Sequence, residues 1–138
     1  MASDSAHPLH ILEIAAADGR AAIDATRRGL SVSAVDALVE TGRLSLSEID
    51  RIVLPRKTQS HRRGLGALTP DQSDRLIRVA RVIAAAEETF GSSEKAHRWL
   101  RRKTTALGGD APLDLLDTSG GARQVERLLS RIDHGLAA

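Results

Sequence analysis

The chain has 138 residues, with 20 Lys or Arg against 18 Asp or Glu and no cysteine. This length predicts one domain or two very small ones, and the absence of cysteine excludes a disulfide framework, a thiol nucleophile and a thiolate metal site. No apolar run approaches the ~20 residues of a membrane span, and the start of the chain lacks the pattern of a secretory signal, so we expect a cytoplasmic protein. One Trp, one Phe and no Tyr argue against a protein that grips single strands by base stacking.

Good helix formers dominate the chain and alternating β-branched runs do not occur, which predicts an all-α protein. We expect a disordered tail over residues 1–8, followed by helices over about 9–17 and up to about residue 28, where Gly29 is a natural stop. The next helix is expected over 35–41, capped by Ser31 or Ser33 and ended by Gly42.

Residues 35–63 follow a helix-turn-helix pattern. Ser45 and Glu48 have the spacing of a capping box, which starts a short helix to about Ile52. Pro55 suits the first position of a helix through Arg63, ended by glycines 64 and 66. Many such turns carry a glycine between the two helices, and positions 52–54 here carry none.

The second helix of this pattern is the predicted DNA reader. Its segment 55–63 contains four cations and no acid, and the start of such a helix faces base edges in the major groove. Arg and Gln can pair with guanine and adenine, whereas cations at the far end suit phosphates. The predicted DNA-binding residues are Arg56, Lys57, Thr58, Gln59, Ser60, Arg62 and Arg63. The alternative is a solvent-exposed basic helix in an unrelated bundle.

Thr69-Pro70-Asp71-Gln72 is the strongest helix start in the chain, and Gly91 follows the expected last residue, Phe90. Such a helix is a spine of roughly 30 Å. Its apolar residues form two stripes that cover most of its circumference, which predicts packing both on its own domain and on another chain. We therefore divide the chain into a helix-turn-helix region, 9–68, and a spine with a C-terminal domain, 69–138.

The C-terminal part predicts three short helical elements. Ser92 or Ser93 caps a helix to about Arg102 with Trp99 and Leu100 facing inward, and a turn at 107–109 leads to a helical turn at 112–116. The last helix is expected over 121–135. Its apolar residues are spaced as a seam for another helix: Ala122, Val125, Leu129, Ile132 and Leu136.

The sequence predicts no catalytic constellation, metal site or cofactor. The glycine pairs at 108–109 and 120–121 match no phosphate loop or dinucleotide fingerprint. Asp114 and Asp117 could be paired carboxylates, but a helix cap and an exposed acid are the favoured interpretation. Of the five histidines, only His7 and His10 have the spacing of metal ligands. The other three are His61, His97 and His134.

The pattern L-G-G-x-x-P-L-D-L-L-x-T over 107–118, continued by Gly121, Val125, Leu129, Ile132 and His134-Gly135, closely resembles the toxin-binding domain of Xre/MbcA/ParS-type antitoxins. The upstream segments that also look like this family are 55–58, 61–62, 68–76, 90–91, Ala96 and 99–100. The resemblance covers about residues 30–138. Gln59 departs from the family's pattern, which has an apolar residue after Pro-Arg-Lys-Thr.

The resemblance implies an all-helical antitoxin of a type II module. Such proteins bind their own promoter, a double-stranded operator, through an N-terminal helix-turn-helix. Their C-terminal domain binds a RES-domain toxin, which consumes NAD. The antitoxin covers the NAD pocket of this toxin, and antitoxins of this type form homodimers within the toxin–antitoxin complex. The residues expected to contact the toxin are Trp99, Arg101, Arg102, Leu107, Gly108, Gly109, Asp114, Arg123, Ile132 and His134. The alternatives are a stand-alone dimeric repressor without a toxin and a small enzyme or its regulatory subunit.

Overall fold

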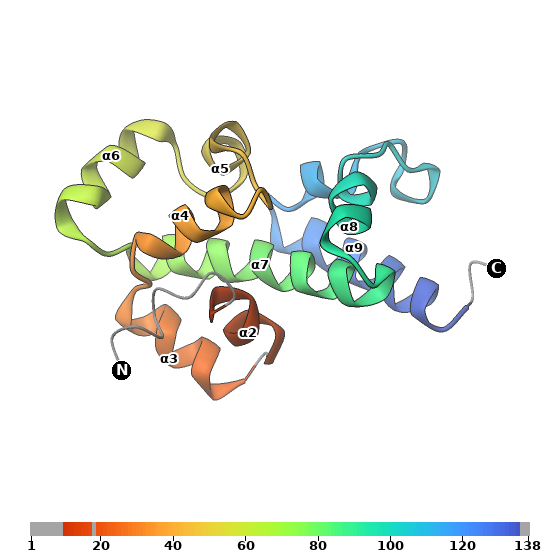
Figure 1. The fold of residues 1–138 in the computed structure, drawn as a ribbon, viewed down its shortest axis with the longest axis horizontal. Helices are drawn as coiled ribbons and strands as arrows, with labels where there is room; N and C mark the ends of the chain where they lie inside the picture. Colours follow the sequence, from red (N-terminus) through yellow and green to blue (C-terminus); the bar gives the residue numbers. More distant parts are fainter. Residues whose placement is uncertain (1–9, 18, 136–138) are drawn as a thin grey trace.

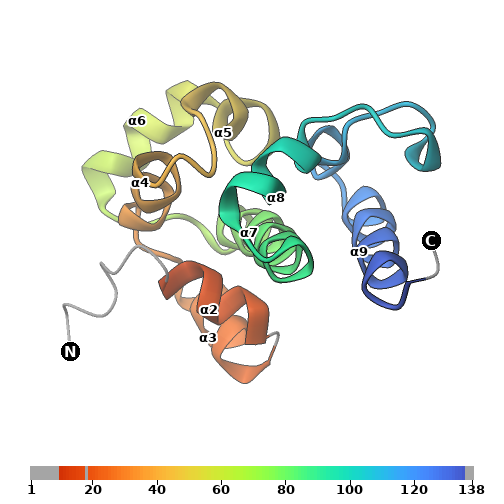
Figure 2. The same ribbon diagram turned by 45° about the vertical axis from the view of Figure 1, so that its right-hand side comes forward.

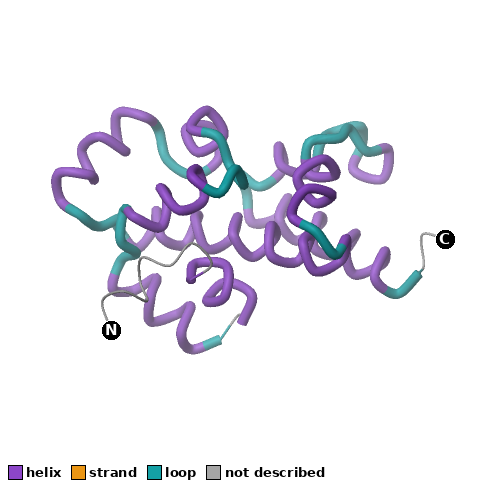
Figure 3. The backbone as a smooth tube through the Cα atoms, in the orientation of Figure 1, coloured by secondary structure: helices purple, strands orange, loops and turns teal. Residues whose placement is uncertain are grey.

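The computed structural model describes residues 10–17 and 19–135, and this part of the chain is built of helices and loops (Figure 1, Figure 3). Its helices are α2 (His10–Ala17), α3 (Arg20–Arg28), α4 (Ser33–Glu40), α5 (Leu46–Ile52), α6 (Arg56–Leu65), α7 (Pro70–Phe90), α8 (Ser93–Leu100) and α9 (Ser119–Asp133). Two 3-10 turns, η1 (Thr105–Leu107) and η2 (Pro112–Leu115), lie between α8 and α9. The all-α prediction is confirmed, whereas the predicted tail and His7 lie outside the described residues.

Helix α7 is the predicted spine, with the predicted ends. Thr69 Oγ1 accepts from Gln72 N at 3.1 Å, and Gln72 Oε1 accepts from Thr69 N at 2.9 Å, which completes the capping box. Gly91 ends the helix in the left-handed region, with φ of 74°. The signals at both ends are local, and local signals were enough to place this helix.

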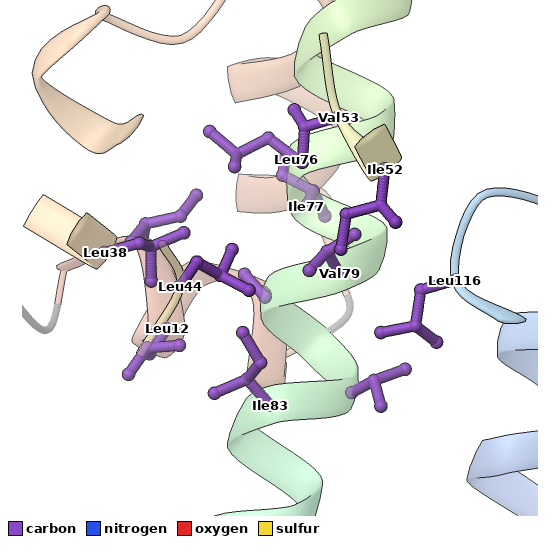
Figure 4. Packing of buried hydrophobic residues seen from close by; sticks show 14 of the residues in the cluster. Leu12, Leu38, Leu44, Ile52, Val53, Leu76, Ile77, Val79, Ile83 and Leu116 are labelled. Carbon is purple, nitrogen blue, oxygen red and sulfur yellow. The ribbon is translucent and has the colours of Figure 1, made fainter. Parts of the chain in front are cut away.

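Both apolar stripes of α7 are covered by helices of the same chain. Helices α2 and α3 pack on one side, and α8 and α9 pack on others (Figure 1, Figure 2). Figure 4 shows Leu12, Leu44 and Leu116 converging on this helix from three different segments. The two apolar stripes from which a second chain was predicted are thus buried by helices of the same chain.

Helices α4, α5 and α6 lie together on the opposite side of α7 from α3 (Figure 1). Both ends of α6 differ from the prediction. Pro55 is the residue before α6 rather than its first residue, and Gly64 lies inside the helix, which ends at Gly66 with φ of 79°. Helix α4 begins at Ser33, where Ser31 Oγ accepts from Ser33 N at 3.2 Å. Residues 69–70 begin α7 at the predicted division, but α7 packs with helices from both sides of it.

Helix α9 begins two residues before the predicted start, with Thr118 as its cap. The seam of this helix faces α7, with Ala122, Val125 and Leu129 buried. These seam residues are thus buried against α7 within the chain. Leu136 lies outside the described residues. What remains for a partner is the opposite, polar side of α9 and the loops before it.

Candidate functional sites

The link between α5 and α6 is rigid although it lacks a glycine. Ser45 Oγ accepts from Glu48 N at 3.1 Å and Glu48 Oε1 accepts from Ser45 N at 2.9 Å, which confirms the capping box. Val53 and Leu54 are buried in the link. Asp50 Oδ1 accepts from Arg56 N at 2.6 Å and so caps the start of α6. Apolar anchors and one carboxylate therefore set the angle at which α6 leaves α5.

Helix α6 is the outermost helix of this group and presents a polar surface. Gln59 is its one buried residue, so the rest of the helix is at least partly open to solvent. Arg56, Lys57 and Ser60 are exposed, and Thr58 is half-buried. No described residue forms an ion pair with the side chain of Arg56 or Lys57. These two cations are free to meet a phosphate backbone.

Gln59 is placed differently from the sequence prediction. It is only 6% exposed, and its Nε2 donates to the Leu54 carbonyl at 3.2 Å. The side chain therefore points into the protein and is not offered to a base edge. The position is one that suits an apolar residue, and the hydrogen bond to Leu54 satisfies the amide that stands there instead.

The two arginines near the end of α6 already have partners inside the chain. Arg62 Nε donates to the Ala67 carbonyl at 2.8 Å. Arg63 donates to both carboxylate oxygens of Asp36 on α4, at 3.0 and 2.6 Å, and these hydrogen bonds raise the pKa of Arg63. Arg62 keeps a charge without a counter-ion, whereas Asp36 offsets the charge of Arg63.

The predicted toxin-contact residues fall into two groups in the structure. Those exposed to solvent are Arg102, Gly108, Gly109, Asp114, Arg123 and His134. The others are at least partly buried: Leu107 belongs to the core, Ile132 packs against it, and Trp99 stacks on Phe90 with ring centroids 5.3 Å apart. Leu107 can thus meet a partner mainly through the backbone of its turn.

Two residues of the predicted toxin site, Arg101 and Asp114, pair with α5. Arg101 Nε and Nη2 donate to Glu48 at 2.9 and 2.7 Å, and Asp114 pairs with Arg51. Burial raises the pKa of Glu48, but hydrogen bonds from Arg101 and Ser45 outweigh burial and hold this pKa below its usual value. These pairs join the helix-turn-helix to the C-terminal part, and no motif or spacing in the sequence predicts them.

The turn before α9 depends on Gly121, which was predicted as the first residue of the last helix. A Cβ on Gly121 would lie 1.9 Å from the Leu115 carbonyl oxygen. Thr118 Oγ1 accepts from Gly121 N at 3.0 Å, which caps the helix at the same place. The close approach of η2 and α9 therefore requires glycine here.

Two family models match the chain in succession. A model of the antitoxin Xre-like helix-turn-helix domain matches residues 21–81, and a model of the antitoxin Xre/MbcA/ParS C-terminal toxin-binding domain matches residues 85–135. The first match contains α5 and α6, and the second contains α8, both 3-10 turns and α9. Each match thus holds one of the two candidate surfaces.

Similar proteins from several bacteria carry matching names. An Antitoxin Xre of Pseudomonas putida is 37% identical over 78% of this chain and 67% of its own length. An Antitoxin Xre of Yersinia enterocolitica is 33% identical over 88% of this chain and 84% of its own length. A Prs ADP-ribosylating antitoxin of a Sphingobium species is 34% identical over 51% of this chain and 50% of its own length. In the described part of the chain, no helix is long and apolar enough to cross a bilayer.

Proposed function

The chain belongs to the Xre family of antitoxins, and from this premise we propose that it neutralises a RES-domain toxin and represses its own operon. The toxin consumes NAD, and the C-terminal part of this chain covers its active site. The observation that carries the proposal is that one chain joins a helix with two unpaired cations, Arg56 and Lys57, to a block matched by a toxin-binding domain.

The toxin-binding half of the proposal rests on the exposed residues of the C-terminal block. Arg102, Gly108 and Gly109 lie on the loops after α8, and Arg123 lies on α9. The loops after α8 lie at the other end of α7 from α6 (Figure 1), and the start of α9 lies beside Arg78 in the middle of α7. A toxin bound there leaves α6 open. The name of the Sphingobium relative supports ADP-ribosyl transfer as the chemistry of the partner.

The DNA-binding half rests on α6. Arg56, Lys57 and Ser60 face solvent at the start of the helix, where a major-groove helix contacts base edges. Arg62 and Arg63 follow toward the far end and suit phosphates. We leave Gln59 out of this surface because its side chain is buried.

The proposal includes a homodimer in the cytoplasm, within a toxin–antitoxin complex, bound to a palindromic operator. Since the apolar stripes of α7 are buried within the chain, we place the dimer interface on another surface. Leu65, at the end of α6, is 59% exposed and is a candidate contact. The mass of the purified chain, measured by light scattering, tests this part of the proposal alone.

Co-expression with the toxin encoded beside it tests the main proposal. We expect a stable complex on size exclusion, and NAD consumption by the toxin only when the antitoxin is removed. The isolated antitoxin should turn over no NAD. The absence of a complex together with operator binding would favour the stand-alone repressor, and NAD turnover by the isolated chain would overturn the antitoxin function.

A further inference from the structure

A shallow groove runs along α7 between α3 and the start of α9. Two adjoining hollows of about 270 and 210 Å³ form it, and they share Asp74, Ile77 and Arg81 on α7. Arg27 and Ile23 line the α3 end. The other lining residues that bear on the argument are Arg78, Ser119 and Arg123 toward α9. We call this surface the α3/α9 groove.

Positive charge exceeds negative charge in the α3/α9 groove. Arg27, Arg78, Arg81 and Arg123 line it, and among the described residues the acids near them are Asp74 and Glu126. Arg81 pairs with Glu126 at 3.1 Å, whereas Arg78 lies 3.9 Å from Asp74. No described residue forms an ion pair with Arg27 or Arg123. The groove therefore complements an acidic ligand.

Arg78 lines the α9 end of the groove and is largely buried there. Its side chain is only 12% exposed. Its Nη1 and Nη2 donate to Ser119 Oγ at 3.2 Å and the Asp117 carbonyl at 3.4 Å, but its Nε is buried without a hydrogen-bond partner in the described part of the chain. The charge of Arg78 therefore adds to the positive potential of the groove, whereas its Nε has practically no exposed surface and is out of reach of a ligand.

The position of the groove indicates a protein rather than DNA as the ligand. Helices α3 and α6 lie on opposite sides of α7 (Figure 1), so the α3 end of the groove faces away from a duplex bound by α6. The other end reaches Arg123, which is one of the proposed toxin contacts. Ile23, 45% exposed at the α3 end, adds an apolar contact.

We propose that the α3/α9 groove binds an acidic segment of the toxin. Carboxylates of that segment approach Arg27, Arg78 and Arg123, and an apolar side chain packs on Ile23. This inference rests on the proposed antitoxin function and extends the toxin interface beyond the C-terminal block onto α3, which lies in the region matched by the helix-turn-helix model.

Charge reversal tests this surface without disturbing the core. Arg27→Glu and Arg123→Glu alter exposed side chains, and Arg28→Glu is the matched control because Arg28 is exposed, adjacent on α3 and outside the groove. Calorimetry of each variant with purified toxin should show affinity reduced at least about tenfold for either groove variant and a weaker salt dependence. The control should bind within about twofold of the wild type, and all variants should keep operator affinity and helical circular dichroism.

The possible failures are distinguishable. If the wild type binds toxin and Arg27→Glu binds equally well, the groove is not part of the interface and the antitoxin function stands, whether or not Arg123→Glu weakens binding, because Arg123 already belongs to the proposed toxin surface. If the variants lose self-association instead of toxin affinity, the occupant is a second copy of this chain and the proposal is overturned. If the wild type binds no toxin, both the proposed function and this inference fail.

Discussion

The guanidinium of Arg101, the residue that follows α8, holds both carboxylate oxygens of Glu48 on α5, with Nε 2.9 Å from Oε2 and Nη2 2.7 Å from Oε1. The same Nη2 donates to the Arg43 carbonyl at 3.0 Å. Glu48 meanwhile accepts from Ser45 N in the capping box of α5. One carboxylate thus starts the first helix of the helix-turn-helix and fastens it to the C-terminal block.

Two further ion pairs cross the same boundary. Arg43 holds Glu87 on α7 at 2.7 and 3.0 Å, and Arg51 pairs with Asp114 on η2. Because bidentate arginine–carboxylate pairs constrain orientation as well as distance, these contacts fix α5 and therefore α6 relative to the proposed toxin surface.

Removing the charge of Glu48 is expected to reduce stability in a pH-dependent way. The folded state lowers the pKa of Glu48 below its usual 4.5, so the pair stabilises the protein above that pH, and this contribution is lost as pH falls through the folded-state pKa. Glu48→Gln should reduce the free energy of unfolding at pH 7 by about 2 kcal/mol, since the pair is largely buried. Urea unfolding at pH 7 and at pH 3.5 should show a smaller loss on acidification for this variant.

Glu94→Gln is the control for this experiment. Glu94 lies on α8, is 82% exposed and reaches Arg98 only at 4.0 Å, so its removal should change stability by less than about 0.5 kcal/mol. Parallel pH curves for the wild type and Glu48→Gln would contradict the assigned role of Glu48.

Gln59→Leu is expected to leave operator affinity unchanged. The side chain is buried and its amide donates to the Leu54 carbonyl, so leucine exchanges one hydrogen bond for apolar burial and should alter stability by no more than about 1 kcal/mol. Ser60→Ala, an exposed neighbour, is the comparison for a residue on the DNA-facing surface. If Gln59 instead contacted adenine, Gln59→Leu would lose about 1–3 kcal/mol of discrimination in a competition assay with altered operators.

The slope of operator affinity against salt concentration is expected to reflect the number of cations on α6 that have no ion-pair partner among the described residues. Arg56, Lys57 and Arg62 carry charges with no ion-pair partner among the described residues, whereas Asp36 offsets Arg63. Log affinity should therefore fall with log salt at a slope of about −2 to −3 for each bound protomer. Fluorescence anisotropy with a labelled promoter duplex at several salt concentrations measures this slope.

Asp36→Asn and Arg56→Ala should move that slope in opposite directions. The first frees Arg63 and should steepen the slope by about 0.9, and the second removes a phosphate contact and should flatten it by about the same amount. A wild-type slope near zero would remove DNA binding from the proposed function.

The helix ends were predictable from the sequence because their signals are local. The boxes at Ser45 and Thr69 involve residues three apart, and Gly91 acts on the turn that it ends. The pairs Arg43–Glu87, Arg101–Glu48 and Arg51–Asp114 join residues 44, 53 and 63 apart in the chain. No periodicity or spacing in a single sequence indicates contacts of that range.

The packing around α7 was not predictable for the same reason. Periodicity shows that a helix is apolar on two sides, but it does not show what covers each side. The sequence pattern suggested a second chain, whereas α2 and α3 from one end of the sequence and α9 from the other supply the cover. Likewise, the sequence showed the run of basic residues on α6. The burial of Gln59 and the ion pair of Arg63 with Asp36 depend instead on the packing of α4 and α5.

Adjacent glycines at the start of α9 provide the sharpest test of the C-terminal packing. A Cβ on Gly121 would lie 1.9 Å from the Leu115 oxygen, so Gly121→Ala must push η2 away from α9 and should reduce stability by about 1–3 kcal/mol. On Gly120 the nearest atom to a Cβ is a side-chain nitrogen of Arg123 at 3.9 Å, so Gly120→Ala should stabilise the helix by about 0.5–1 kcal/mol.

Urea unfolding followed by the fluorescence of Trp99, the single tryptophan of the chain, reports on this block directly because Trp99 packs on Phe90 within it. Gly121→Ala should also weaken toxin binding while Gly120→Ala does not, since only the first displaces η2, the turn that carries Asp114. Equal unfolding midpoints for the two variants would mean that η2 does not pack against α9 in solution.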